Sequence, residues 1–204
     1  MKALEKNFFL EDGIHVARHL LGKIMVREVL GEAYYFKIVE TEAYMGAEDK
    51  GAHVFGNKKT DRTAPLYEVG GTTYIYLIYG MYHCLNIAAN HKGIPHCVLI
   101  RALEPLDDKA RRFARENRQI KSKKDMDLTN GPGKLCKALK IDKSLNNQLV
   151  TTTKNPLWIG EGSNEKIEIV EAKRINIPYA EEYQDKLWRF YIKENPYVSV
   201  IQKD

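Results

Sequence analysis

The chain has 204 residues, of which 44% are hydrophobic and 29% charged, and a formal net charge of +5. Such a chain can bury one core, and no Pro/Gly/Ser-rich linker or repeat divides it, so we predict a single domain over residues 1–204. No apolar run approaches the roughly 20 residues of a membrane span, and the amino terminus lacks a secretory signal. We expect an intracellular protein that does not contact membranes.

The hydrophobic pattern predicts an α+β domain. A helix is expected over 14–21, ended by Gly22, and strands over 23–30 and 34–39 that are joined at Gly31. Further strands are expected over 73–79, 82–89, 97–103, 167–173, 188–192 and 198–201, with helices over 106–118 and 134–139. Because short turns join the strands and the helices are segregated, we predict a mixed, largely antiparallel curved β-sheet with peripheral helices and a protruding β-hairpin.

Residues 39–44, VETEAY, place two carboxylates beside a tyrosine. In an extended backbone Glu40, Glu42 and Tyr44 share one face. They follow an apolar strand, so their charges must be solvated, paired or held for chemistry. A strand end with two solvated acids is the simpler interpretation, and the residues alone leave both open.

Residues 73–87 form a tyrosine-rich segment in which two apolar runs flank Gly80. Alternation places Tyr74 and Tyr76 on one strand face, where aromatic residues most often belong to the core. Tyr79 and Met81 fall at the tip of the predicted hairpin. Large apolar side chains exposed at a turn suggest insertion into a partner, as in proteins that part base steps from the minor groove.

A basic stretch follows between residues 109 and 124, where Glu116 is the single acid. Arg111, Arg115 and Arg118 would share one helix face. That face is either an ordinary solvated surface or one that follows phosphates. The next segment, 129–134 (TNGPGK), offers backbone N–H groups and Lys134 for phosphate binding.

The three cysteines, Cys84, Cys97 and Cys136, are an odd number without close pairing. Buried free thiols in a reducing compartment fit them best. Because no C-x-x-C spacing occurs, we predict no metal site and no other cofactor.

Several stretches together resemble one known family in its order across nearly the whole chain. They are VETEAY at 39–44, Glu48-Asp49 with Ala52-His53, Thr60-x-Arg62, YIYLIYGMYHCLN at 74–86, VLIRALEP at 98–105, GPGKLCKAL at 131–139 and WRFYIKENPYVSV at 188–200. The family is the alkyladenine (3-methyladenine or methylpurine) DNA glycosylases of the mammalian type, here in a bacterial form. The resemblance implies the same α+β architecture.

The resemblance implies an enzyme that flips damaged purines out of duplex DNA and hydrolyses their N-glycosidic bonds. The expected lesions are 3-methyladenine, 7-methylguanine, hypoxanthine and ethenoadenine. It assigns the general base to Glu42 and places Arg101 beside the abasic sugar. From the residues alone Glu40 and Glu42 are equivalent, and a two-carboxylate mechanism stays open. No lysine is placed to form a Schiff base, so we expect a monofunctional glycosylase.

The resemblance also implies a base pocket, a residue that fills the DNA gap, and phosphate contacts. It implies that the flipped base lies between Tyr44, Tyr76 and His53, that Asn86 crowds undamaged guanine, and that residues near Ile175 close the pocket. Tyr79, with Met81, enters the DNA. Phosphate contacts are expected from Arg62, Gly131, Gly133 and Lys134.

The chain departs from the family at Thr63, where Asn is common, and over 142–167, which carries little resemblance. Two other classes of function remain as alternatives. An inactive lesion- or RNA-binding relative would not need Glu42, and a hydrolase of nucleosides or free bases would not need Tyr79 at an exposed tip. The glycosylase is expected to be monomeric, cytoplasmic and nucleoid-associated, with duplex DNA containing damaged purines as its partner.

Overall fold

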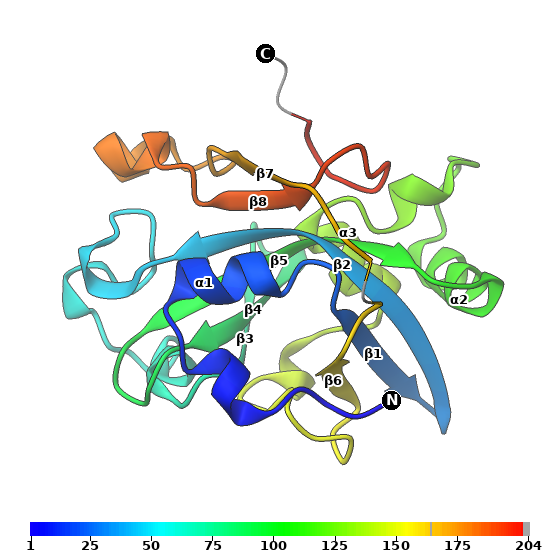
Figure 1. The fold of residues 1–204 in the computed structure, drawn as a ribbon, viewed down its shortest axis with the longest axis horizontal. Coiled ribbons are helices and arrows are strands. Elements are labelled where there is room, and N and C mark those ends of the chain that lie inside the picture. The colour runs from blue at the N-terminus through cyan, green and yellow to red at the C-terminus, as the bar shows by residue number, and fades with distance from the viewer. Residues whose placement is uncertain (164, 202–204) are drawn as a thin grey trace.

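One curved antiparallel sheet organises the chain, as Figure 1 shows. The computed structural model describes residues 1–163 and 165–201. The strands are β1 (Ile24–Val29), β2 (Glu32–Tyr44), β3 (Thr73–Ile78), β4 (Tyr82–Ala89), β5 (His96–Pro105), β6 (Leu157–Gly160), β7 (Ile169–Ala172) and β8 (Arg189–Ile192). They lie in the order β3-β4-β5-β2-β1-β6, and β8 pairs with both β2 and β7.

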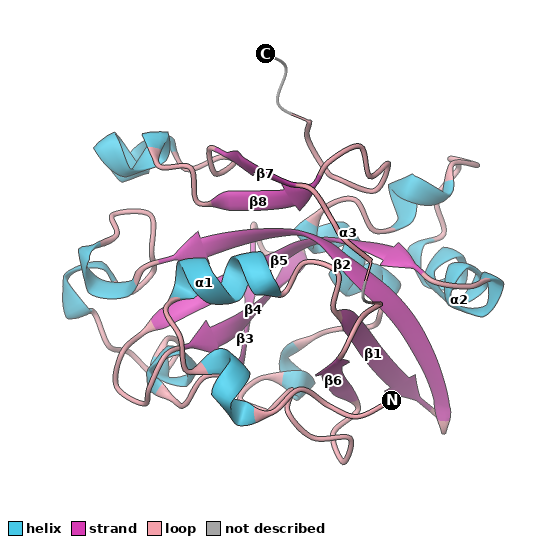
Figure 2. Cartoon of the chain, in the orientation of Figure 1, coloured by secondary structure: helices cyan, strands magenta, loops and turns pink. Residues whose placement is uncertain are grey.

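The helices lie on the outside of this sheet in Figure 2. The α-helices are α1 (Gly13–His19), α2 (Asp108–Arg118) and α3 (Pro132–Ala138). Short 3-10 helices are η1 (Lys6–Phe9), η2 (Gly46–Glu48), η3 (Phe55–Asn57), η4 (Ala64–Tyr67), η5 (Asp125–Leu128), η6 (Lys143–Leu145) and η7 (Pro178–Asp185). The α+β class and the single curved sheet predicted from the sequence are confirmed.

Strand β2 positions the site because it changes partner part-way along. Its first half pairs with β1, from Glu32 to Lys37, while β8 pairs with Glu40, Thr41 and Glu42. On the other side β5 runs along β2 from Phe36 to Tyr44, with register shifts at Ile38/Glu40 and Glu40/Thr41. A bulge of this kind bends a strand and redirects its side chains. The bend therefore falls at the two carboxylates.

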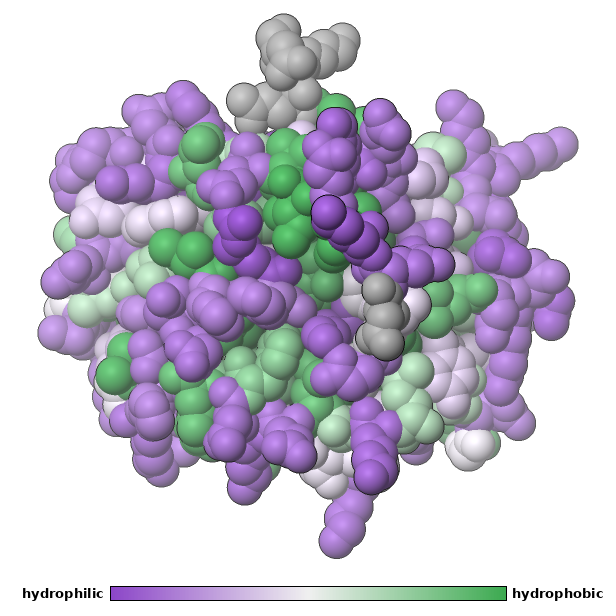
Figure 3. Space-filling model, viewed as in Figure 1, coloured by the Kyte–Doolittle hydropathy of each residue, from purple (hydrophilic) through white to green (hydrophobic). Residues whose placement is uncertain are grey.

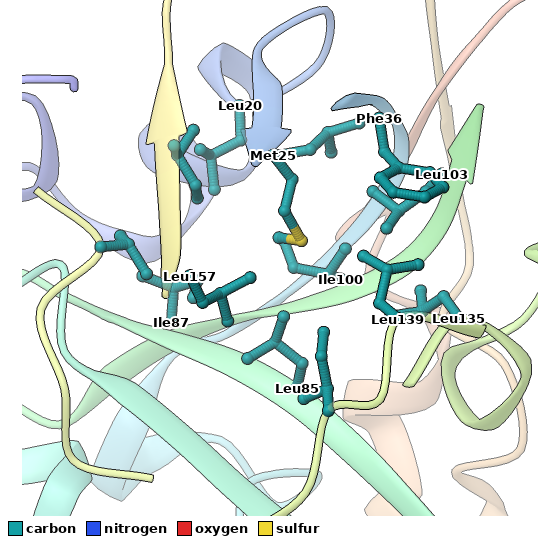
Figure 4. Close-up of a cluster of buried hydrophobic side chains, with 14 of the residues drawn as sticks. Leu20, Met25, Phe36, Leu85, Ile87, Ile100, Leu103, Leu135, Leu139 and Leu157 are labelled. Atoms are coloured by element: carbon teal, nitrogen blue, oxygen red, sulfur yellow. The ribbon is translucent and has the colours of Figure 1, made fainter. Parts of the chain in front are cut away.

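The main core lies between the concave sheet and the helices that cover it. Figure 4 shows Met25, Phe36 and Ile100 from the sheet meeting Leu135 of α3. Each buried side chain of this size contributes roughly 1.5–3 kcal/mol through the hydrophobic effect. Asp12 caps α1 by accepting hydrogen bonds from two backbone N–H groups of its first turn. Packing against the helices therefore makes the sheet a rigid support for its edge strands.

The sequence predictions fail at three places. The strand predicted over 34–39 continues to Tyr44, so the acids lie inside it rather than at its solvated end. Residues 198–201 form no strand, because side chains rather than a neighbouring strand bind their backbone groups. Strand β6 was not predicted, since its four residues are too short to show a period.

The three cysteine thiols lie inside the protein. Cys84, Cys97 and Cys136 are all free and buried, as predicted. Figure 3 shows hydrophilic residues over most of the displayed face, with smaller apolar areas between them. Within residues 1–163 and 165–201, no helix has the length and apolarity needed to cross a membrane.

Candidate active site

Glu40 is completely buried in a dense set of donors. Its Oε1 accepts from Arg101 Nε at 3.2 Å, Arg189 Nη1 at 3.0 Å and Ser199 Oγ at 2.9 Å. Its Oε2 accepts from the Ser199 backbone N–H at 2.7 Å. Two arginines and a serine therefore hold Glu40 as a structural ion-pair centre that joins β2, β5, β8 and the carboxy-terminal segment.

Glu42 is also completely buried, but its donors differ. Its Oε1 accepts from the Ile175 backbone N–H at 2.8 Å and lies 3.2 Å from Arg101 Nη1. Its Oε2 accepts from the Tyr44 hydroxyl at 2.9 Å. Since a carboxylate oxygen can accept about two hydrogen bonds, Oε2 can accept one more. Tyr44, Arg101 and Ile175 all line one cleft, so this carboxylate lies directly behind the cleft wall.

Arg101 of β5 bridges the two carboxylates. Burial alone would lower the pKa of this guanidinium, but the charges of Glu42 and Glu40 outweigh burial and raise it. Arg101 is therefore permanently charged. Burial, followed by the charge of Glu42, raises the pKa of Tyr44 well above its ordinary value, so its hydroxyl stays a hydrogen-bond donor.

An aromatic cluster lies beside Glu42. The His53 ring packs edge-on against Tyr76 with centroids 4.6 Å apart, and its Nδ1 lies 3.0 Å from the Tyr74 hydroxyl. Removal from water lowers the pKa of His53 to about 4, helped by the charge of Arg62, so the imidazole is neutral. Burial raises the pKa of Tyr74 to about 12. Asn86 donates to the Tyr74 carbonyl at 3.2 Å. The rings form an uncharged pocket wall.

Two spaces with shared lining residues adjoin this cluster. The inner one, about 30 Å³, is bounded by Tyr44, His53, Tyr76 and Asn86 and is large enough for a water molecule only. The outer cleft, about 430 Å³, reaches Arg101 and Ile175. Tyr44 and Tyr76 border both spaces. The base-pocket residues predicted from the sequence thus lie together around a small inner recess and a larger outer cleft.

Tyr179 of η7 also borders both spaces, and the sequence analysis did not find it. Its side chain is exposed, and its hydroxyl donates a long hydrogen bond of 3.4 Å to the Gly51 carbonyl. A 3-10 segment has no amphipathic period over so few residues, so the sequence carried no signal for this tyrosine.

The β3–β4 hairpin places its apolar tip in solvent. Tyr79 is 77% exposed and Met81 is 69% exposed, as expected for side chains available to a partner. Tyr79 and Gly80 both have positive φ angles, 54° and 68°, and the Met81 N–H closes the turn on Ile78 O at 3.1 Å. A tyrosine in the left-handed region costs about 1–2 kcal/mol. The tip therefore keeps a large aromatic residue at an unfavourable backbone position.

The basic helix α2 is mostly neutralised within the chain. Arg111 pairs with Asp108, and Arg115 pairs with Asp125 at 2.6 Å. Arg118 instead lines the cleft, and its Nε is buried without a hydrogen-bond partner among residues 1–163 and 165–201. The structure therefore singles out Arg118 from the three arginines that the sequence placed on one face.

The residues predicted to bind phosphate lie in two places. Gly131, Gly133 and Lys134 line the outer cleft, with Lys134 Nζ 2.7 Å from Asn130 Oδ1. Gly133 also has a packing role, because a Cβ added there would lie 3.0 Å from the Tyr82 Cβ. Arg62 is exposed on the other side of the pocket, with its guanidinium 5.3 Å from the Tyr76 ring centroid.

One histidine pair was passed over in the sequence analysis. His15 and His19 stand four residues apart on α1, and their rings stack at 4.0 Å. Across the described part of the chain, no group of three or more His, Cys, Asp or Glu side chains could hold a metal ion. The pair is a surface stacking contact.

A buried carboxylate with a free acceptor position, an adjacent aromatic recess and an exposed aromatic hairpin occur together here. The family model for methylpurine-DNA glycosylase (MPG) matches residues 7–196. The chain belongs to this family. It is a DNA N-glycosylase of base excision repair, and DNA is its substrate.

Individual relatives agree with the family model. A Natranaerobius thermophilus protein named "Putative 3-methyladenine DNA glycosylase" is 48% identical over 197 residues, covering 97% of this chain and 98% of its own length. A Clostridioides difficile protein of the same name is 49% identical, covering 93% of this chain and 100% of its own. One from Clostridium acetobutylicum is also 49% identical, covering 98% and 99%.

Proposed function

We propose that this glycosylase hydrolyses the N-glycosidic bond of alkylated or deaminated purines with a water molecule activated by Glu42. The observation that carries the proposal is the contrast between two neighbouring carboxylates. Glu40 is held by Arg189 and Ser199, which are not among the residues that line the outer cleft, whereas the three donors of Glu42, namely Tyr44, Ile175 and Arg101, all line it. Glu42 is therefore the better candidate to accept a proton from a water molecule in the cleft, which supports a single-carboxylate mechanism over a two-carboxylate one.

For an alkylated purine the chemistry requires little more than this carboxylate. Alkylation at a ring nitrogen makes the purine cationic, which weakens the N-glycosidic bond and lets the base leave as a neutral molecule. Hypoxanthine and ethenoadenine are neutral lesions, so their departure also requires a proton on the leaving base, and in the proposal water in the cleft supplies it. Glu42 removes a proton from the attacking water, and its negative charge stabilises the oxocarbenium-like sugar. Arg101, 3.2 Å from Glu42, orients the carboxylate and offers a cation to a phosphate or water beside the sugar.

The donors to Glu42 are Tyr44, Ile175 and Arg101, none of which is a lysine. A mechanism through a Schiff base requires an amine at the reacting carbon. The enzyme is therefore proposed to be monofunctional, releasing the base without breaking the DNA strand.

The damaged nucleotide must leave the duplex to reach Glu42. Base flipping costs a few kcal/mol. In the proposal Tyr79 fills the gap in the stack while the base enters between Tyr44, Tyr76 and His53. An electron-poor base gains ~0.5–2 kcal/mol of cation–π attraction on such rings. Asn86, at the closed end of the recess, excludes the exocyclic amine of normal guanine.

The proposed substrates are 3-methyladenine, 7-methylguanine, hypoxanthine and ethenoadenine in duplex DNA, attacked by a monomeric enzyme. The uncharged walls of the pocket support this breadth, since they stack with many purines and hydrogen-bond with few. The test is single-turnover excision from a labelled duplex containing hypoxanthine, followed by heating in alkali. Release of base with alkali-dependent strand breaks supports the proposal. Binding without release would favour an inactive lesion-binding protein, and activity on free nucleosides alone would favour a nucleoside hydrolase.

A further inference from the structure

A second buried ion pair lies behind the catalytic carboxylate. Arg174 and Asp49 are both completely buried at their side chains, and they meet through two parallel contacts, Nη1–Oδ2 at 2.6 Å and Nη2–Oδ1 at 2.8 Å. This bidentate geometry fixes the orientation of both groups, unlike a single contact. Asp49 also accepts from the backbone N–H groups of Met45 and Gly51, at 3.0 and 2.9 Å. It therefore anchors the loop that leads to His53.

Arg174 connects this anchor to Glu42 in three ways. Its Nη1 donates to the Ala43 carbonyl at 3.1 Å, on the strand between Glu42 and Tyr44. Its guanidinium lies 4.7 Å from the Tyr44 ring centroid, below the hydroxyl that donates to Glu42. The next residue, Ile175, gives its backbone N–H to Glu42 Oε1 at 2.8 Å. The positions of Tyr44 and Ile175, two of the three donors to Glu42, therefore depend on the position of Arg174.

We propose that the Arg174–Asp49 pair positions Glu42 for proton abstraction. This inference rests on the proposed role of Glu42 as general base. Neither member of the pair touches the reacting atoms, so both are positioning residues. The fixed guanidinium holds Tyr44 and Ile175 at the two oxygens of the carboxylate, and Asp49 cancels most of its charge.

The test compares the single-turnover rate of hypoxanthine excision in wild type, Arg174→Gln and Asp49→Asn. A roughly 10- to 100-fold lower maximal rate is expected for both variants, because small misplacements of reacting groups have effects of up to about 10²-fold. A rate within about threefold of wild type in either variant would overturn the inference.

Two further variants separate geometry from charge. Arg174→Lys keeps the positive charge but should not restore the rate, because an ammonium cannot make the bidentate contact. Gly51→Ala keeps every charge, yet its new Cβ would lie 3.0 Å from Arg174 Nη2. It should lower the rate several-fold. If the ion-pair variants do not fold, Gly51→Ala alone decides, and a wild-type rate there would refute the positioning role.

Binding is measured in a Glu42→Gln background, with the uncleaved hypoxanthine duplex as probe. Adding Arg174→Gln should change the dissociation constant less than about threefold, because the pair acts on the chemical step. A binding loss equal to the rate loss would show a general disturbance of the pocket and overturn the inference. Full excision by Glu42→Gln itself would instead refute the proposed function, so the two failures are distinguishable.

Discussion

Glu40 and Glu42 lie two residues apart on β2, and both are completely buried, yet they accept hydrogen bonds from largely different donors. Arg101 is shared between them, while Arg189 and Ser199 serve Glu40, and Tyr44 and Ile175 serve Glu42. The bulge in β2 makes this separation possible, because it turns the two side chains toward different neighbours.

The first prediction uses this pair as its own control. Glu42→Gln should lower single-turnover excision of hypoxanthine by roughly 10²–10⁴-fold while the fold and lesion binding are kept, because a positioned base is lost without a change of size. Glu40→Gln should mainly lower the melting temperature, since it leaves Arg189 without its buried counter-charge and Arg101 paired with Glu42 alone. If Glu42→Gln excised hypoxanthine at a rate within about threefold of wild type, the role of general base would be assigned to Glu40 instead.

The second prediction concerns the basic helix. Arg118→Ala should weaken binding to damaged and undamaged duplex alike and flatten the dependence of log K on log salt, because Arg118 lines the cleft and is not among the arginines of α2 paired with an acid in the described part of the chain. Arg111→Ala and Arg115→Ala are matched controls, since Asp108 and Asp125 already neutralise those side chains. Equal effects of all three changes would favour a general basic surface. An unchanged salt slope in every variant would make α2 an ordinary solvated helix.

The third prediction addresses the hairpin tip. Tyr79→Ala should slow excision by removing stacking of ~1–3 kcal/mol, most strongly for a well-paired lesion and least opposite a mismatch. Tyr79→Gly should slow excision as much and yet melt at the same or a slightly higher temperature, because glycine relieves the positive φ. A Tyr79 variant that melts several degrees lower and excises normally would identify a core residue.

The fourth prediction is a pH dependence. With a pKa of about 4, His53 is neutral throughout the range in which histidines usually titrate. His53→Gln should therefore leave the shape of the excision profile unchanged from about pH 5 to 8, even if the rate falls. If the pH–rate profile of His53→Gln lacked a rise or fall that wild type shows in that range, His53 would be titrating during catalysis.

The lowered pKa of His53 also makes the stability of the fold depend on pH. The unfolded chain binds a proton at His53 near pH 6.5 and the folded chain only near 4, so His53 favours folding fully above about 6.5 and progressively less as the pH falls toward 4. The melting temperature of wild type should therefore decline more steeply over this interval than that of His53→Gln. Parallel curves would contradict a neutral folded-state imidazole.

The sequence predicted the strands and helices that carry long hydrophobic periods. It also predicted that Glu42 and Tyr44 lie side by side, because residues two apart on a strand share one face. It could not predict the backbone N–H of Ile175 as a donor, because main-chain groups leave no residue signature. The Arg174–Asp49 pair joins positions 125 residues apart, which no local period reports. Tyr179 lies on an irregular 3-10 segment without any such period.

The order of the chain has a consequence for protein synthesis. Glu40 and Glu42 leave the ribosome long before Ile175, Arg189 and Ser199, which complete their hydrogen bonds. Until then Arg101 is their shared counter-charge, and burying two carboxylates on one guanidinium would leave an unpaired charge. Contacts of such long sequence separation also form slowly. If Glu42 is the general base as proposed, a nascent chain completes its base-removing centre only at the end of translation, and unfinished copies of the enzyme would be inactive.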